Sequence, residues 1–155
     1  MVHNPLYKKY TIENFISRER CEEIISLAEA YGNWTSTRHE NYPTTDIPIQ
    51  DIPGFNFHEI RSITNIISSK YELDGAEITP FDLFVVKYEY NGQSKLDFHR
   101  DASILSFVLL LSHEDDFEGG GTIYKESGDL IKPSRGALTI HCGKIRHAGA
   151  EITSG

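Results

Sequence analysis

A histidine and an aspartate, His99 and Asp101, close the stretch FDLFVVKYEYNGQSKLDFHRD. Side chains alternate between the two faces of an extended strand, so His99 and Asp101 are predicted to point one way and Arg100 the other. One imidazole and one carboxylate are two of the three ligands in the 2-His-1-carboxylate set that binds non-heme Fe(II). The third ligand must come from a distant strand, and His147 is a candidate.

The triplet is weak evidence when taken alone. With seven histidines in 155 residues, chance supplies about 0.4 His-x-Asp triplets, and an exposed polar pair at a strand end is the simpler alternative. His141 lies within ALTIHC on the face shared with Thr139, which suits either the wall of a site or a core histidine hydrogen-bonded to backbone. His39 and His113 are predicted to be surface residues.

Composition limits the function classes. A net charge of −8 without any basic run argues against a nucleic-acid partner. No apolar run reaches the roughly 18 residues that span a bilayer, and the start MVHNPLYKKY lacks the apolar core of a secretory signal. Cys21 and Cys142 form no recognisable framework and are expected to be buried thiols. We therefore expect a cytoplasmic protein without a membrane partner.

Two amphipathic helices are predicted in the first half of the chain. The first begins after an N-cap at Ser17 and ends at Gly32, and its apolar stripe is Cys21, Ile24, Ile25, Ala28 and Tyr31. The second covers roughly residues 56–71, with a buried stripe of Ile60, Ile63, Ile66 and Ile67 and a turn at Gly75. These helices are predicted to support the site without taking part in the chemistry.

Residues 33–53, between the two helices, show no periodicity. A stretch of this length in a compact domain is typical of a functional loop, although a solvated connection fits equally well. Trp34 and Tyr42 in this stretch, together with Arg100, are candidates for contact with a substrate.

Strands dominate the second half. They are predicted at residues 78–90, 96–111, 122–125, 129–132, 137–142 and 148–152, with another short strand at 6–12. Residues 105–111 are apolar on both faces, which suits an inner strand. The pattern predicts one α+β, mainly β domain over residues 1–155, in which residues 1–75 supply helical support and a loop and 76–155 form a jelly roll.

Several segments, in order, resemble the Fe(II)- and 2-oxoglutarate-dependent dioxygenases of the prolyl 4-hydroxylase and lysyl hydroxylase type. They are FVVKYEYNGQ, HRDASILSFVLLLS, DFEGGGTIY, KPSRGALTIHCGK and RHAGAEITSG, with YTIENFISRERCEEIISLAE and NYPTTDIPI before them. The resemblance implies a double-stranded β-helix, a variant of the jelly roll, with the metal at its open mouth.

The resemblance also implies roles for individual residues. His99, Asp101 and His147 would bind Fe(II), and Tyr88 and Thr122 would contact 2-oxoglutarate, although strand packing is an equal alternative for these last two. The implied reaction is hydroxylation of a prolyl or lysyl residue in a peptide, or of a related small molecule. Succinate and CO2 would be the co-products, and ascorbate an additional cofactor.

The end of the sequence departs from the family pattern. The family places an Arg or Lys about ten residues after the distal histidine, where it pairs with the far carboxylate of 2-oxoglutarate. This sequence ends at Gly155, eight residues after His147. We expect a longer natural chain that supplies this residue and the closing strand. The alternative is a catalytically impaired metal-binding jelly roll that acts as a binding module.

Overall fold

The first long helix has the ends that the sequence predicts. The structure is a computed structural model that describes residues 4–74 and 77–155. Helix α1 spans Arg18–Tyr31, and the Ser17 hydroxyl accepts a hydrogen bond from the amide of Arg20 at its start. Gly32 ends the helix in the left-handed conformation at φ 69°, which glycine adopts without a steric penalty.

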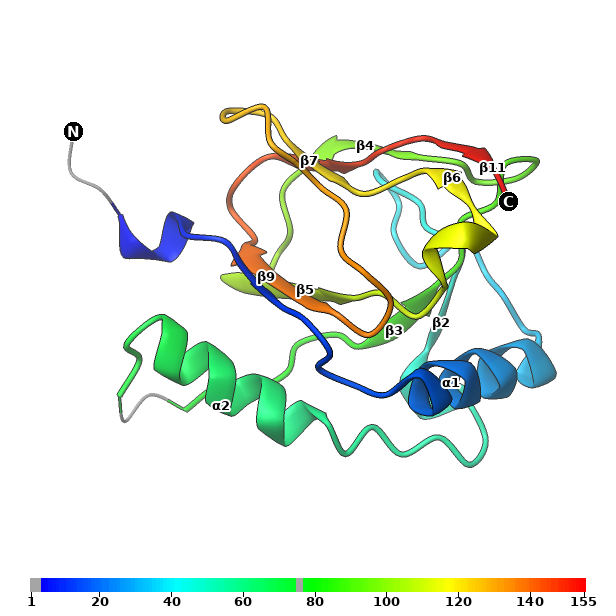
Figure 1. Cartoon of the computed structure of the whole chain (residues 1–155), viewed down its shortest axis with the longest axis horizontal. Coiled ribbons are helices and arrows are strands. Elements are labelled where there is room, and N and C mark those ends of the chain that lie inside the picture. Colours follow the sequence, from blue (N-terminus) through cyan, green and yellow to red (C-terminus); the bar gives the residue numbers. More distant parts are fainter. Residues whose placement is uncertain (1–3, 75–76) are drawn as a thin grey trace.

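Helix α2 spans Ile60–Lys70 and is shorter at its start than the predicted 56–71. Its buried face, Ile63 and Ile67 with Tyr71 just beyond, packs against Leu138 and Ile140 of strand β9. Both helices lie below the strands in Figure 1, so they cover the same side of the β structure. Gly75, the predicted turn, lies outside the described residues.

The strands form two larger sheets and two short pairs. The first sheet has the order β1 (Tyr10–Ile12), β9 (Leu138–Cys142), β5 (Leu105–Leu109), and the second has β4 (Leu96–His99), β10 (His147–Gly149), β7 (Thr122–Tyr124), β8 (Leu130–Ile131). The short pairs are β2 (Asp46–Pro48) with β3 (Phe84–Val86), and β6 (Glu118–Gly119) with β11 (Ile152–Ser154). All strand pairings are antiparallel among the described residues. Three short 3-10 helices complete the structure: η1 (Pro5–Tyr7), η2 (Ile49–Asp51) and η3 (Glu114–Asp116).

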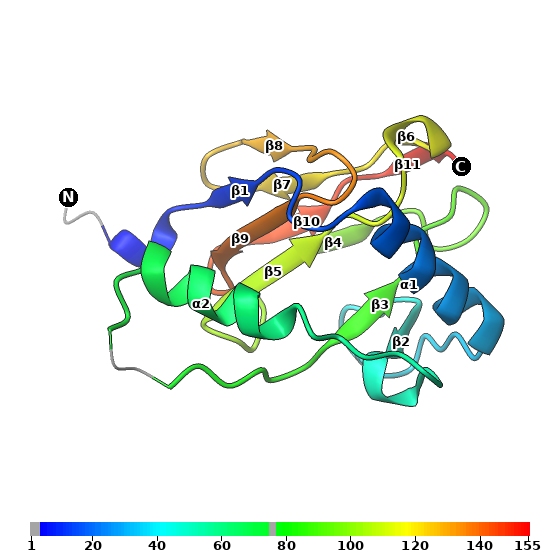
Figure 2. The same ribbon diagram turned by 60° about the horizontal axis from the view of Figure 1, so that its bottom comes forward.

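The two larger sheets face each other across a buried interior. Strand β9 alternates between Leu138 and Ile140, which pack on α2, and Thr139 and His141, which occupy its other face. His141 meets Tyr124 of β7 there, and both side chains are almost fully buried. In Figure 1, β9 and β5 lie below β4 and β7, and Figure 2 shows α2 beside β9 and β5. The predicted α+β, mainly β class is therefore confirmed, while the missing closing strand and the domain limits stay predictions.

Several strand predictions are wrong in extent. The predicted strand 96–111 is two strands, because residues 100–104 bend away between β4 and β5. Of the predicted strand 78–90, only residues 84–86 form a strand. The predicted strand 148–152 is divided between the end of β10 and the start of β11. Strand β5 lies at the edge of its sheet rather than inside it, and the fully buried central strand is β9.

The loop 33–53 contains more structure than its sequence indicates. Strand β2 and the 3-10 helix η2 lie within it. The Arg38 guanidinium bridges the buried carboxylate of Asp46 and the carboxylate of Asp82. This ion-pair network fixes the loop to the segment before β3. No helix among the described residues is long and apolar enough to cross a membrane.

Candidate metal centre

Two neighbouring strands bring His99 and His147 together. His99 is the last residue of β4, His147 is the first of β10, and the two are direct partners in the antiparallel register. Directly opposed residues on one face are close enough for their side chains to meet. The centroids of the two imidazole rings are 4.4 Å apart.

Asp101 reaches the same point from outside the strand, which corrects the prediction of one continuous strand through it. Strand β4 ends at His99, and the amide of Asp101 donates to the carbonyl of Gly143 at 2.7 Å. The ammonium of Lys144 donates to the carbonyls of Asp101 and Ala102 at 2.9 and 2.8 Å. The turn before β10 therefore holds the aspartate against the two histidines.

The three side chains form a compact donor set. Asp101 Oδ1 lies 3.3 Å from the Nε2 atoms of both His99 and His147. One ligand atom from each residue lies within 4.8 Å of the others, and no other such group occurs among the described residues. Two imidazole nitrogens and one carboxylate oxygen on one side of an ion, with the other side open, suit non-heme Fe(II).

Backbone carbonyls fix the proton positions on both imidazoles. His99 Nδ1 lies 2.8 Å from the carbonyl oxygen of Asp97, and His147 Nδ1 lies 2.8 Å from that of Ile145. Because a carbonyl only accepts, each Nδ1 must carry the proton, and each Nε2 presents its lone pair to the site. Both rings are thus in the tautomer that a metal requires.

The second carboxylate oxygen of Asp101 has its own partners. Ser106 donates its hydroxyl to Oδ2 at 2.6 Å, and Ser103 lies 2.7 Å from the Ser106 hydroxyl. Burial alone would raise the pKa of Asp101, but hydrogen bonds donated to its carboxylate, among them the one from Ser106, outweigh burial and hold that pKa far below its ordinary value. The carboxylate is therefore ionised, as a metal ligand must be.

A fourth histidine lies beside the three. His141, 1 % exposed, has its ring centroid 4.4 Å from that of His147, and its Nδ1 lies 2.8 Å from the hydroxyl of Tyr124. Its hydrogen bond is thus to a side chain, not to backbone. Burial lowers the pKa of His141 and raises that of Tyr124, so both groups are neutral.

The three residues predicted to contact a substrate lie in different parts of the structure. The Tyr42 ring lies 5.2 Å from that of His99, at a pocket of about 190 Å³ that is also lined by Gln93, Leu96 and Asp97. Arg100 is exposed and donates to the carbonyl of Lys144. Trp34 packs instead with Ala28, Ile47 and Ile52, in a separate hydrophobic cluster.

Tyr88 and Thr122 both approach Gly149 of β10. Thr122 is the strand partner of Gly149, and a Cβ at Gly149 would lie only 3.0 Å from the Tyr88 hydroxyl. Burial raises the pKa of Tyr88 to about 12, so its hydroxyl keeps its proton and can donate a hydrogen bond. Both residues are therefore neighbours of Gly149, which lies two residues beyond His147 on β10.

His39 and His113 lie outside the donor set. His113 is 39 % exposed and its Nδ1 accepts a hydrogen bond from the amide of Asp115. The His39 side chain is 32 % exposed and lies beside Phe84, while its Nε2 atom is buried 3.7 Å from Asp46. The loop network around Arg38 explains its burial.

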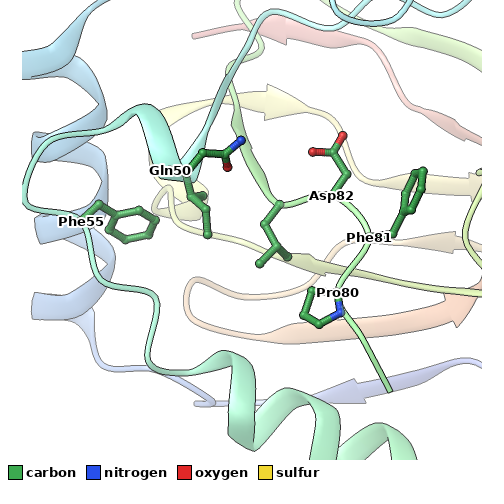
Figure 3. Close-up of a pocket in the computed structure, with 7 residues that line it drawn as sticks. Gln50, Phe55, Pro80, Phe81 and Asp82 are labelled. Atoms are coloured by element: carbon green, nitrogen blue, oxygen red, sulfur yellow. The ribbon is translucent and has the colours of Figure 1, made fainter. Parts of the chain in front are cut away.

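A second, larger groove lies elsewhere. It measures about 320 Å³ and is lined by Ile49, Gln50, Phe55 and residues 80–83. Figure 3 shows Phe55 and Phe81 on opposite sides of this groove, with Gln50 and Asp82 between them. None of the predicted site residues lines it.

Comparison with known proteins finds lysyl hydroxylases that are similar to this chain. Human procollagen-lysine,2-oxoglutarate 5-dioxygenase 2 is 30 % identical over 146 residues, covering 84 % of this chain and 20 % of the relative. The human multifunctional procollagen lysine hydroxylase and glycosyltransferase LH3 is 27 % identical over 147 residues, 85 % of this chain and 20 % of the relative. In sequence, the chain is therefore similar to one part of these 2-oxoglutarate-dependent lysyl hydroxylases. It spans about a fifth of the length of these relatives. No family model matches the sequence.

Solved structures show the same fold. The viral collagen prolyl hydroxylase of Paramecium bursaria Chlorella virus-1, solved with 2-oxoglutarate, superposes with a TM-score of 0.68 at 20 % identity, covering 95 % of this chain and 89 % of that one. A Pseudomonas putida prolyl 4-hydroxylase gives a TM-score of 0.70 at 13 % identity, covering 94 % and 85 %. The two helices and antiparallel sheets are therefore the architecture of prolyl hydroxylases.

Sequence reasoning missed the residues that hold Asp101. Ser106 interrupts the apolar run LSFVLLL, and that interruption is a signal which could have identified it. The pairing of Asp101 with Gly143 has no local signal, because the two residues meet only when β4 and β10 are side by side.

Proposed function

We propose that this chain is an Fe(II)- and 2-oxoglutarate-dependent dioxygenase that hydroxylates a prolyl or lysyl residue in a peptide. Succinate and CO2 are the co-products. The observation that carries the proposal is the meeting of His99, Asp101 and His147, with both Nε2 lone pairs and one carboxylate oxygen directed at one point. When bound there, Fe(II) and 2-oxoglutarate supply the oxidising chemistry, and the protein supplies geometry and a dry site.

The chain's own residues contribute orientation. The carbonyls of Asp97 and Ile145 set the two imidazole tautomers, and Ser106 holds the second carboxylate oxygen of Asp101. Partners of this kind fix the orientation and basicity of metal ligands. The side chains of His99 and His147 are only 11 % and 8 % exposed, which limits access of water to their ring nitrogens.

We assign contacts with 2-oxoglutarate to Tyr88 and Thr122. Both reach Gly149, near the end of β10 that follows His147, and the neutral Tyr88 hydroxyl can donate to a carboxylate. A Tyr88→Phe variant should weaken 2-oxoglutarate binding several-fold, because it removes one charge-assisted hydrogen bond. A cofactor role for ascorbate stays a prediction.

We assign the peptide to the side of the centre that carries Tyr42. This ring is 41 % exposed, borders the 190 Å³ pocket and lies beside His99. Gln93 donates to the carbonyl of Pro43 and accepts from the amide of Thr45, which fixes the loop to the segment before β4. An exposed aromatic ring on a fixed wall suits packing against a prolyl ring or a lysyl chain. A peptide substrate is favoured because the relatives are named as collagen hydroxylases.

The test is succinate formation from Fe(II), 2-oxoglutarate and oxygen by the full-length protein with collagen-like peptides. The His147→Ala variant should lose turnover by at least 100-fold, because a metal ligand is gone. His113→Ala is the matched control, since that histidine is exposed and outside the donor set, and its turnover should be unchanged. Wild-type protein that binds Fe(II) without releasing succinate would favour the non-enzymatic binding module.

A further inference from the structure

His141 contains an unsatisfied nitrogen in the interior. Its Nε2 atom is buried, has no hydrogen-bond partner among the residues that the structure describes, and lies 3.7 Å from Oδ2 of Asp101. That separation is too long for a hydrogen bond, yet short enough for a small movement to close it. A buried polar nitrogen that is left unpaired destabilises the folded state. The position of this nitrogen therefore needs an explanation.

The Tyr124 hydroxyl decides which His141 nitrogen carries the proton. The hydroxyl has one hydrogen bond, to His141 Nδ1 at 2.8 Å. If Nδ1 carried the proton, the tyrosine hydrogen would be left without that partner, and the Nε2 lone pair would face the Asp101 carboxylate. If the hydroxyl donates to Nδ1, the proton lies on Nε2 and faces the negative oxygen instead. Only the second arrangement lets Nδ1 accept from the Tyr124 hydroxyl and also directs the Nε2 proton at the Asp101 carboxylate.

We propose that His141, held by Tyr124, is a positioning residue that presents an Nε2 proton to Oδ2 of Asp101. Together with the Ser106 hydroxyl, which donates to the same oxygen at 2.6 Å, it holds Oδ2 away from the metal position. Oδ1, which lies 3.3 Å from both ligand imidazoles, is left as the single coordinating oxygen. This keeps the remaining positions around the ion open for cosubstrate and oxygen.

His141 is a positioning residue and not a metal ligand in this arrangement, because its Nε2 carries a proton. The inference rests on metal binding by His99, Asp101 and His147, as proposed above. Its first test does not require metal, so its failure can be separated from failure of the proposed function.

The first test is the tautomer of His141 in the metal-free protein, read from a long-range proton–nitrogen NMR spectrum. We expect a protonated Nε2 and an unprotonated Nδ1 in the wild type. The Tyr124→Phe variant removes only the hydroxyl that donates to Nδ1, so it should weaken the preference for the protonated Nε2 without reversing it. A wild-type His141 with the proton on Nδ1 would overturn the proposal.

The second test is affinity for Mn(II), measured from the free ion that remains by electron paramagnetic resonance. Loss of a group that orients a metal ligand typically lowers metal affinity 10- to 100-fold. We expect such a loss for His141→Phe, about 10-fold for Tyr124→Phe, and near wild-type affinity for His141→Gln, whose amide can replace Nε2 as donor. His99→Ala should abolish binding and reports on the metal site itself. Unchanged affinity in folded His141→Phe and Tyr124→Phe proteins would reduce His141 to a packing residue and overturn the proposal.

Discussion

Substituting Gly143 by alanine should weaken metal binding while leaving all three ligand side chains in the sequence. The Gly143 carbonyl accepts from the amide of Asp101, and its amide donates to the carbonyl of Ile104. A Cβ at this position would lie 2.3 Å from the carbonyl oxygen of Ser103 and 3.1 Å from Cβ of Asp101. Ordinary contacts begin near 3.4 Å, so the backbone on one side must move by about an ångström.

The expected size of the effect follows from that displacement. Overpacking of this kind costs about 1 to 3 kcal/mol, which lowers the melting temperature of a domain of this size by about 3 to 10 °C. Because binding sites tolerate only about 0.5 Å of misplacement, Mn(II) affinity should fall at least 10-fold. Gly92→Ala is the control, since its nearest neighbour would be at 3.4 Å, and it should bind Mn(II) as the wild type does. A folded Gly143→Ala protein with wild-type affinity would refute the role of this turn in holding Asp101.

Three further changes test separate parts of the structure. Ser106→Ala removes a hydroxyl that donates to Asp101 Oδ2 and should weaken Mn(II) binding about 10-fold by titration; unchanged affinity would exclude the contact as a support. Arg20→Met removes the two hydrogen bonds to Glu59 and should cost about 2 kcal/mol in urea unfolding at neutral pH. Burial alone would raise the pKa of Glu59, but Arg20 outweighs it and lowers that pKa, so this stabilisation is present above the ordinary carboxyl pKa and disappears as the pH falls below about 4. A difference between Arg20→Met and wild type that stays constant down to pH 3 would contradict this. Ile63→Ala empties a fully buried position against β9 and should cost about 3 kcal/mol in the same assay without changing metal affinity.

Local signals in the sequence predicted local structure well. Ser17 and Gly32 mark the ends of α1 because capping depends on residues within one helical turn. The prediction that His99 and Asp101 face the same way also agrees with the structure, although Asp101 does so from a bend and not from the strand. Their role as metal ligands stays a proposal.

Features set by distant contacts could not be predicted in the same way. The apolar pattern of 96–111 gives no indication that the chain turns at Asp101 to pair with Gly143. Periodicity likewise cannot place β9 at the centre of its sheet, because strand order depends on which strands pair across the fold. The environment of His141 depends on Tyr124 of the opposite sheet, a contact that only the packed structure reveals.

The central claim is tested most directly by anaerobic titration of the full-length protein with Fe(II) and 2-oxoglutarate, followed by visible absorption. A keto acid that chelates Fe(II) gives a charge-transfer band, so the account predicts a band that saturates at one Fe(II) per chain and is absent in His147→Ala. A band of equal strength in His147→Ala, or none in wild-type protein that has bound Fe(II), would contradict the assignment of this centre.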